Sequence, residues 1–477
     1  MFKVLTFKEI QEQLTSLRFV IGFVLSISVT LTATVILTQD HQHQMADYRQ
    51  RISMQDDFLD NYAHSNRISP AVLPQQPPGR FSPLIIGLSS DDQQGSFDDN
   101  PLPTLFPPLD IVFIVTIVLS LMALLLSYDA ICGERQRGTL KLQLANSVKR
   151  ATIILSKWVG GTITLFIPFL LALMMSTLYV VIHPAVAWHA DALFTLLLLA
   201  AGAMTFLSAF YLLGLWISSK TQTPSVSILI CLFIWVLWTL TLPNLSPYMA
   251  AQFYEIPSVN RVEKEVSQLM GIERDQLGRK GSAELSAQYQ SEHPEFWDTF
   301  SQLKRDALKQ RVAADAEFAT LFQAYQDARR QIWREANRVQ GEKAQKLRDD
   351  LNAKAGRQTW TAKHIACLSP YACFVYLATD LTGTGMNQER HFGLQARHYF
   401  QTFRSYLSQK EDAARQADPT YNSNQFIDVS DRPRFHFQEE ALQDRVNTAL
   451  PYWALLLLFN ALLMGMTFID FLKYDVR

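Results

Sequence analysis

The chain has 477 residues, of which 48% are hydrophobic and only 18% are charged, whereas about a quarter of the residues of a soluble protein are usually charged. Its formal net charge is −1, so nothing indicates a nucleic-acid partner, and its four cysteines are too few for a disulfide scaffold of this length. Nearly pure apolar stretches alternate with blocks rich in Lys, Arg, Glu and Gln, which predicts a membrane protein with large polar segments.

The first apolar stretch, Phe19–Leu37, contains no charged residue. It is longer than the roughly 7–15 residues of a signal peptide's apolar region, so we expect an uncleaved membrane helix within region 1–38. Just before it, Leu5, Ile10 and Leu14 alternate with charged side chains. Two interpretations of this segment stay open: a short helix that lies along the membrane interface, or a helical extension of the first span.

Five further apolar stretches approach the ~20 residues that a helix needs to cross the hydrocarbon core. They are Ile111–Ser127, Ile153–Ile182, Leu193–Ile217, Val226–Leu242 and Tyr452–Phe471. Charged residues occur only at the ends of the spans, which argues against an ion-coupled carrier, because such carriers place charges inside the bilayer. The predicted fold class is an all-α polytopic membrane protein with six transmembrane helices and a mainly helical extracytoplasmic domain.

The short loops predict the orientation, because Lys and Arg concentrate on the cytoplasmic side. The loop at 128–152 is basic, whereas His183–Asp191 contains neither Lys nor Arg. We therefore expect the basic loop and both termini to be cytoplasmic. The predicted regions after 1–38 are an extracytoplasmic Pro-rich loop at 39–109, four membrane helices at 110–242, a large extracytoplasmic domain at 243–450, and the last helix with a cytoplasmic tail at 451–477.

The two long segments differ in composition. The first ends in a proline-rich stretch, which predicts extended chain and turns. The second is long enough to have its own core. Within it, Phe318, Tyr325, Ile332 and Val339 recur every seven residues. This period predicts long amphipathic helices, which pack either as a coiled-coil hairpin or as an ordinary helix bundle.

A shorter apolar stretch, Ile365–Leu381, is interrupted by Pro370 and predicts a buried or re-entrant helix beside the membrane. Cys367 and Cys373 flank the proline. On a continuous helix they would be too far apart to bridge, whereas a break at Pro370 would allow a disulfide, and both possibilities stay open. The histidines are scattered and lack the compact ligand set of a zinc site, and no Ser-His-Asp arrangement is visible. We predict no metal ligand and no catalytic residue.

The basic loop between the second and third spans is the most informative segment. Gly133 and Gly138 have the spacing of a P-loop, but Thr139 stands where the phosphate-binding lysine belongs, so we reject nucleotide binding there. A coupling element fits better, because the glycines allow turns and the following leucines offer apolar contacts to a soluble motor subunit. The alternative is a basic loop that only contacts anionic lipid.

This loop resembles the coupling loop of ABC type-two export permeases. The run from Gly133 to Leu142, Gly-Glu-Arg-Gln-Arg-Gly-Thr-Leu-Lys-Leu, is similar to the family's Gly-Glu-Arg-x-x-Gly-Thr, and the ending Phe471–Arg477 is similar to a branch with a large extracytoplasmic domain between the last two membrane helices. The resemblance implies a coupling helix that docks on an ATPase. The residues that it assigns to this coupling are Gly133, Glu134, Arg135, Arg137, Gly138, Thr139, Leu140 and Leu142.

The resemblance also implies a function. The chain would be the permease subunit of an ABC exporter in a bacterial inner membrane, paired with a second permease protomer, identical or related, and with cytoplasmic ATPase subunits. It would be no enzyme and would bind no cofactor, since ATP and Mg would belong to the ATPase. Two alternatives stay open. One is a mechanotransmission complex that moves its periplasmic domain, which a periplasmic partner could contact, without carrying a substrate. The other is a membrane-anchored binding protein without a motor.

Overall fold

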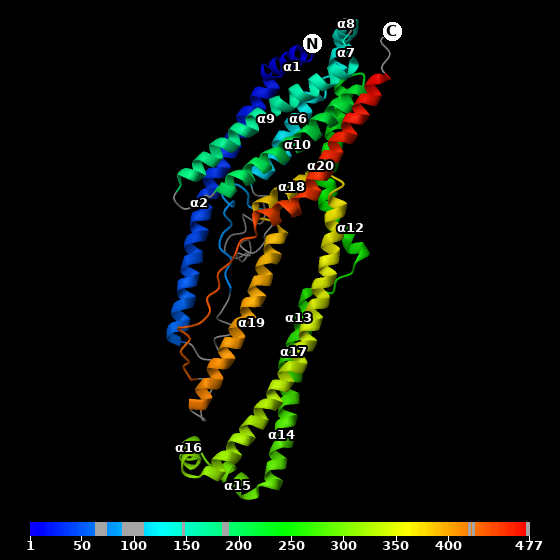
Figure 1. Ribbon diagram of the computed structural model, residues 1–477. Coiled ribbons are helices and arrows are strands. Elements are labelled where there is room, and N and C mark those ends of the chain that lie inside the picture. The colour runs from blue at the N-terminus through cyan, green and yellow to red at the C-terminus, as the bar shows by residue number, and fades with distance from the viewer. Residues whose placement is uncertain are drawn as a thin grey trace.

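Helices form almost the whole protein. The computed structural model describes residues 1–62, 74–87, 109–145, 148–183, 190–417, 421 and 425–473. It is 85% helical, and the described residues include no strand. Within them, six helices are long and apolar enough to cross a membrane: Leu17–Asn61, Ile111–Arg137, Arg150–Ile182, Asp191–Lys220, Pro224–Phe253 and Leu442–Leu472. The six predicted spans are confirmed, and the protein is an all-α polytopic membrane protein (Figure 1).

The segment before the first span is a separate helix, α1 (Phe2–Leu14). The chain breaks at Ser16, whose hydroxyl accepts a hydrogen bond of 3.2 Å from the Phe19 N–H as the next helix begins, in the manner of a helix N-cap. Helix α1 packs against α9 (Arg150–Ile182). It is therefore not an extension of the first span.

The first span belongs to α2 (Leu17–Tyr62), which has 46 residues. At ~1.5 Å per residue this helix is about 70 Å long, more than twice the ~30 Å of the hydrocarbon core. The expectation of a loop from residue 39 onward is wrong for 39–62, because no Gly or Pro interrupts the helix there. Residues 74–87 consist of turns and irregular chain, as the prolines predicted, and the rest of that loop up to 108 lies outside the described residues.

Helix α10 (Ala190–Lys220) lies at the centre of the membrane bundle. Its Phe206, Phe210 and Tyr211 are completely buried. Its neighbours are α9 and the following elements: α6 (Ser120–Ser127), α11 (Pro224–Val236), α18 (Pro370–Thr382) and α20 (Leu442–Leu472). Two spans contain π-helical turns. In the second span, η2 (Ile114–Leu119) follows α5 (Ile111–Phe113) and leads into α6. In the fifth span, η3 (Leu237–Thr241) follows α11 and continues into α12 (Leu242–Phe253).

One polar arm is a helical hairpin, which we call the hairpin arm. Its elements are α13 (Val259–Gln268), η4 (Leu269–Glu273), α14 (Arg274–Glu292), α15 (Pro294–Gln302), α16 (Arg305–Ala314) and α17 (Ala316–Ala366). Helix α14 packs so closely on α17 that a Cβ on Gly278 would lie 2.6 Å from the Trp333 ring. Phe296, Phe318 and Phe322 form a buried cluster at the tip. The predicted long amphipathic helices are confirmed, and they pair as a hairpin.

A second arm joins the far end of α2 to α19 (Met386–Ala417) and to the irregular segment 425–441. Its apolar cluster consists of Leu59, Phe403, Leu407, Ile427 and Val429. Arg432, whose side chain is only 2% exposed, pairs with Asp56 and Asp60 of α2. Both arms leave the same end of the membrane bundle, and the loop that contains α7 (Cys132–Arg137) and α8 (Thr139–Ala145) lies at the opposite end (Figure 1). We call these ends the arm side and the loop side.

The interrupted apolar stretch forms α18. Ser369 caps it by accepting a hydrogen bond from the Tyr371 N–H at 3.1 Å, and Pro370 occupies its first turn. Thirteen residues span about 20 Å, too short to cross the bilayer. Phe374 and Leu377 are completely buried against the membrane helices, which confirms the prediction of a buried helix beside the spans.

Candidate functional site

The candidate site is the loop between α6 and α9, which folds into α7 (Cys132–Arg137) and α8 (Thr139–Ala145). Gly138 ends α7 with a left-handed backbone (φ +76°), and no atom lies within 4 Å of the Cβ that another residue would add there. Any residue with a side chain would adopt this φ at a cost. The glycine thus allows the sharp turn that separates the two short helices.

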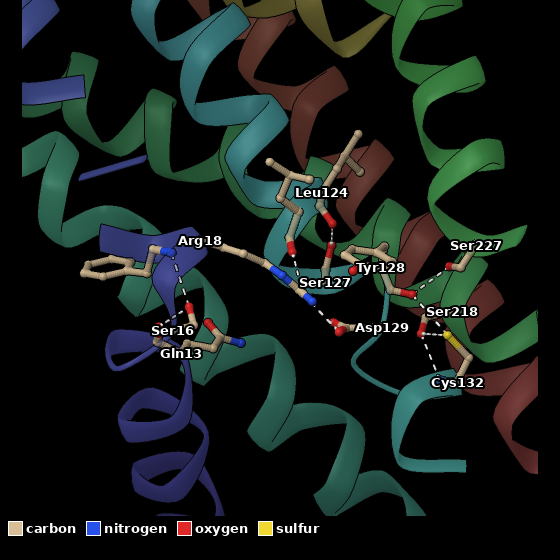
Figure 2. A network of polar contacts seen from close by, with 12 residues as sticks. Gln13, Ser16, Arg18, Leu124, Ser127, Tyr128, Asp129, Cys132, Ser218 and Ser227 are labelled. Atoms are coloured by element: carbon tan, nitrogen blue, oxygen red, sulfur yellow. Dashed lines mark hydrogen bonds and ion pairs between the residues drawn. The ribbon is translucent and has the colours of Figure 1, made fainter. Parts of the chain in front are cut away.

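Hydrogen bonds from neighbouring spans hold the start of α7 in place (Figure 2). The Ser218 hydroxyl of α10 accepts hydrogen bonds from the backbone N–H groups of Ile131 (3.0 Å) and Cys132 (3.1 Å). The Ser227 hydroxyl of α11 donates to the Tyr128 carbonyl at 2.7 Å. Because these donors and acceptors belong to two membrane helices, the loop moves only if those helices move or the hydrogen bonds break.

Arg18, at the start of α2, ties the first span to the same loop (Figure 2). Its guanidinium forms a 3.0 Å ion pair with Asp129 and donates to the Leu125 carbonyl at 3.3 Å. It also stacks over the Tyr128 ring, 4.9 Å from the centroid. The arginine side chain is 45% exposed, so this contact orients the loop more than it stabilises the fold.

A buried ion cluster joins three elements of the site. Lys157 of α9 lies 3.1 Å from Glu9 of α1 and 2.9 Å from Glu134 of α7, and the three side chains are 5%, 13% and 8% exposed, respectively. We call these residues the Lys157 triad. Gln143 of α8 donates to Glu134 at 3.3 Å. The triad therefore connects the short loop helices to both α1 and α9.

Close helix packing surrounds the triad. A Cβ on Gly160 would lie 3.1 Å from Glu9, and one on Gly161 would lie 2.0 Å from the Tyr211 ring. Tyr211 accepts a 2.8 Å hydrogen bond from Gln13 of α1. The two glycines are needed because α1, α9 and α10 meet here with no room for side chains on α9.

The predicted coupling residues divide into two faces. Gly133, Glu134 and Leu140 are buried, and Leu140 has no exposed surface. Arg135 points inward too: its guanidinium donates to the Thr221 and Ser219 carbonyls at the end of α10, both at 3.1 Å.

The residues on the other face are exposed, although the Thr139 hydroxyl donates back to the Glu134 carbonyl at 3.3 Å. Arg137 and Thr139 are exposed, Leu142 is 67% exposed, and Lys141 lies beside them. We call Arg137, Thr139, Lys141 and Leu142 the outward face of the loop. The structure thus separates residues that hold the loop from residues that are free to contact another molecule.

Sequence reasoning missed several residues of the site. Lys157 was visible as a charge at the edge of an apolar run, and a charge in that position needs a partner. Its partners Glu9 and Glu134 lie 148 and 23 residues away, so no local pattern could identify them. Ser218 and Asp129 likewise gain their roles only from the packing of distant helices.

The described residues contain no group of three or more His, Cys, Asp or Glu side chains that could hold a metal ion. Cys367 and Cys373 are both free thiols in the structure. The helix break before Pro370 brings these two residues close together. The Cys373 thiol donates a hydrogen bond to the Cys367 carbonyl at 3.4 Å.

The family described as "ABC-2 family transporter protein" matches residues 4–408. The matched part includes the loop site, five of the six spans, the hairpin arm, and the second arm except for the end of α19 after residue 408 and the segment 425–441. No curated protein matches the chain significantly.

Proposed function

Since the chain belongs to the ABC-2 transporter family and is a permease subunit of an ABC transporter, we propose that it works as an exporter driven by a separate cytoplasmic ATPase. The observation that carries this proposal is the two-faced loop of α7 and α8. An ATPase needs an accessible surface to dock on and a rigid connection from that surface to the membrane helices. The outward face offers the first, and the buried face offers the second.

The proposed route of force starts at the outward face. A displacement of α8 pulls on Glu134 through Gln143 (3.3 Å) and then on the Lys157 triad. Because Lys157 belongs to α9 and Glu9 to α1, both helices receive the movement together. Arg135 passes it to the end of α10 through two backbone carbonyls. ATP and Mg are proposed to reside on the partner ATPase.

A substitution on the outward face tests this proposal. We expect Leu142→Asp to abolish stimulation of the partner's ATP hydrolysis and to weaken copurification of the two subunits. The thermal unfolding temperature of the chain should hardly change, because Leu142 is 67% exposed and exposed positions usually contribute within about 0.5 kcal/mol. The measurement is ATP turnover of the reconstituted complex, with and without the substitution.

Ile272→Asp provides the matched control, because Ile272 is similarly exposed (59%) but lies in the hairpin arm. It should leave ATP turnover unchanged. Normal coupling in the Leu142→Asp protein would contradict docking at the outward face. If no ATPase copurifies with the chain, the result would instead favour the alternative of a membrane-anchored binding protein without a motor.

A second candidate function is force transmission without a carried substrate. Helix α2 runs unbroken for 46 residues from the loop side into the second arm, and α17 has 51 residues. Such continuous helices would transfer a movement at the membrane to the arms. Reconstitution in sealed vesicles separates the two functions, because ATP-dependent flux across the bilayer supports export. Hydrolysis without flux, together with an ATP-dependent change in the distance between the arms, supports force transmission.

We further propose that the loop side and both termini face the cytoplasm of a bacterial inner membrane, as the basic loop predicts. The arms would then be periplasmic, where a partner could contact them. The permease is proposed to work with a second protomer, identical or related. Cross-linking of the purified complex distinguishes a pair of this chain from a mixed pair.

The two neighbouring thiols allow a prediction about redox state. We propose that Cys367 and Cys373 form a disulfide under oxidising conditions. After mild oxidation and denaturation, an alkylating reagent should modify two of the four cysteines, as counted by intact mass. In Cys367→Ser, three should remain reactive under the same treatment. Four modified cysteines in the oxidised natural sequence would contradict the pairing.

A further inference from the structure

Helix α1 (Phe2–Leu14) packs with its polar residues inward. The side that contacts α9 and α10, which we call the protein side, carries Thr6, Glu9 and Gln13. Thr6 and Gln13 are buried, and the Glu9 side chain is 13% exposed. Val4 and Phe7, by contrast, are 68% and 69% exposed. A surface helix in water buries its apolar side instead, so this arrangement indicates apolar surroundings around α1.

Helix α1 lies at the loop side, and its contacts fall within the apolar parts of two spans (Figure 1). Gly160, where a Cβ would lie 3.1 Å from Glu9, is seven residues inside the apolar stretch of α9 that starts at residue 153. Tyr211, which accepts a hydrogen bond from Gln13 at 2.8 Å, is six residues inside the stretch of α10 that ends at residue 217. Both positions correspond to about 10 Å along the helices. Helix α1 therefore lies beside the membrane part of the bundle, not beyond it.

Two further sides follow from the helix geometry, because successive residues lie about 100° apart around the axis. Phe7, Ile10 and Leu14 lie next to the protein side and form an apolar side. The remaining residues are exposed and form a polar side, which consists of Lys8, Gln11 and Glu12. Val4 lies between Phe7 and Lys8. A helix at a membrane interface has this division, with one side toward the acyl chains and another toward the head groups and water.

The exposed apolar surface continues along the chain into the first span. Leu17, Val20 and Ile21, at the start of α2, are all exposed, and a membrane-spanning helix presents such residues to lipid. The lysines of α1 suit the head groups. Lys8 belongs to the polar side, and Lys3 is exposed at the first turn, from where its long side chain reaches outward past its apolar neighbours. Both the apolar surface and the charges of α1 therefore match a phospholipid leaflet.

We propose that the loop-side lipid leaflet holds α1 against α9, with Phe7 among the acyl chains and Lys3 and Lys8 at the phosphate groups. The lipid then keeps Glu9 on Lys157, because α1 leaves α9 only if Phe7 leaves the acyl chains for water, which is unfavourable. Lipid contact and the Lys157 triad thus support the same position of α1. The inference depends neither on the partner ATPase nor on which side of the membrane is cytoplasmic.

Spin labels on the full chain in phosphatidylcholine vesicles test where α1 lies. A nitroxide is attached at Phe7→Cys, at Gln11→Cys or, as a control on the hairpin arm, at Ile272→Cys, and the natural sequence gives the background from its four cysteines. We expect collisions with oxygen, which concentrates among acyl chains, to dominate at position 7. Collisions with a water-soluble nickel chelate should dominate at positions 11 and 272. Equal access of the chelate to positions 7 and 272 would overturn the proposal. Protection of position 7 from both reagents would also overturn it, because a second copy or another subunit would then cover this side.

Hydrogen exchange in lipid nanodiscs, followed by mass spectrometry, tests the link between lipid contact and the triad. In Phe7→Ser, the backbone amides of α1 should exchange at least about tenfold faster, as loss of one large apolar side chain from the acyl layer implies. Phe7→Leu should keep the exchange slow, and Lys157→Met should accelerate it in the same residues. Gln11→Ser, on the polar side of α1, is the matched control and should change the rate less than about twofold. Unchanged exchange in Phe7→Ser, or equal acceleration in Gln11→Ser, would show that lipid does not hold α1.

Discussion

Replacing Lys157 with methionine is expected to lower the free energy of unfolding by about 3–5 kcal/mol, the usual cost of removing one partner from a buried ion pair. The substitution leaves Glu9 and Glu134 facing each other without a cation, although their side chains are only 13% and 8% exposed. The two carboxylates then repel each other, and the ionic connection that joins α7 to α1 and α9 is lost. The measurement is chemical or thermal unfolding of the full chain in detergent.

A rescue experiment distinguishes lost charge pairing from lost packing. Combining Lys157→Met with Glu9→Gln and Glu134→Gln removes all three charges and should recover most of the stability, because a neutral cluster no longer contains unpaired carboxylates. Lys473→Met, at an exposed lysine after α20, is the control and should have little effect. If the triple variant is no more stable than Lys157→Met alone, the electrostatic explanation is wrong.

Leu140→Ala is expected to cost about 2–5 kcal/mol, as for other fully buried leucines. Leu140 has no exposed surface and belongs to the main apolar core, so truncation leaves a cavity under α8. The matched substitution Leu142→Ala, two residues later on the same short helix, should change stability by no more than about 0.5 kcal/mol. Unfolding in denaturant measures both.

The pair also separates anchoring from docking. Leu142→Ala should weaken ATPase coupling in a protein of normal stability, whereas Leu140→Ala should reduce coupling and stability together. Leu140→Asp is a poor probe of docking for the same reason, since it places a carboxylate in the core. Equal stability losses for the two alanine variants would contradict the division of the loop into a buried and an outward face.

The sequence by itself determined the number and position of the membrane spans, because an apolar stretch long enough to cross a bilayer is a local property. The seven-residue spacing of Phe318 and Tyr325 likewise determined the long helices of the hairpin arm. The Gly133–Leu142 motif was enough to indicate the family, and the match over residues 4–408 then showed it.

Tertiary structure alone decided how the loop works. Residues two apart on a helix lie about 200° apart, so Leu140 and Leu142 had to face opposite ways, but only the packing of α8 against the bundle decided which of them is buried. The Lys157 triad brings together residues 9, 134 and 157 from three helices, and no periodicity records such distant contacts.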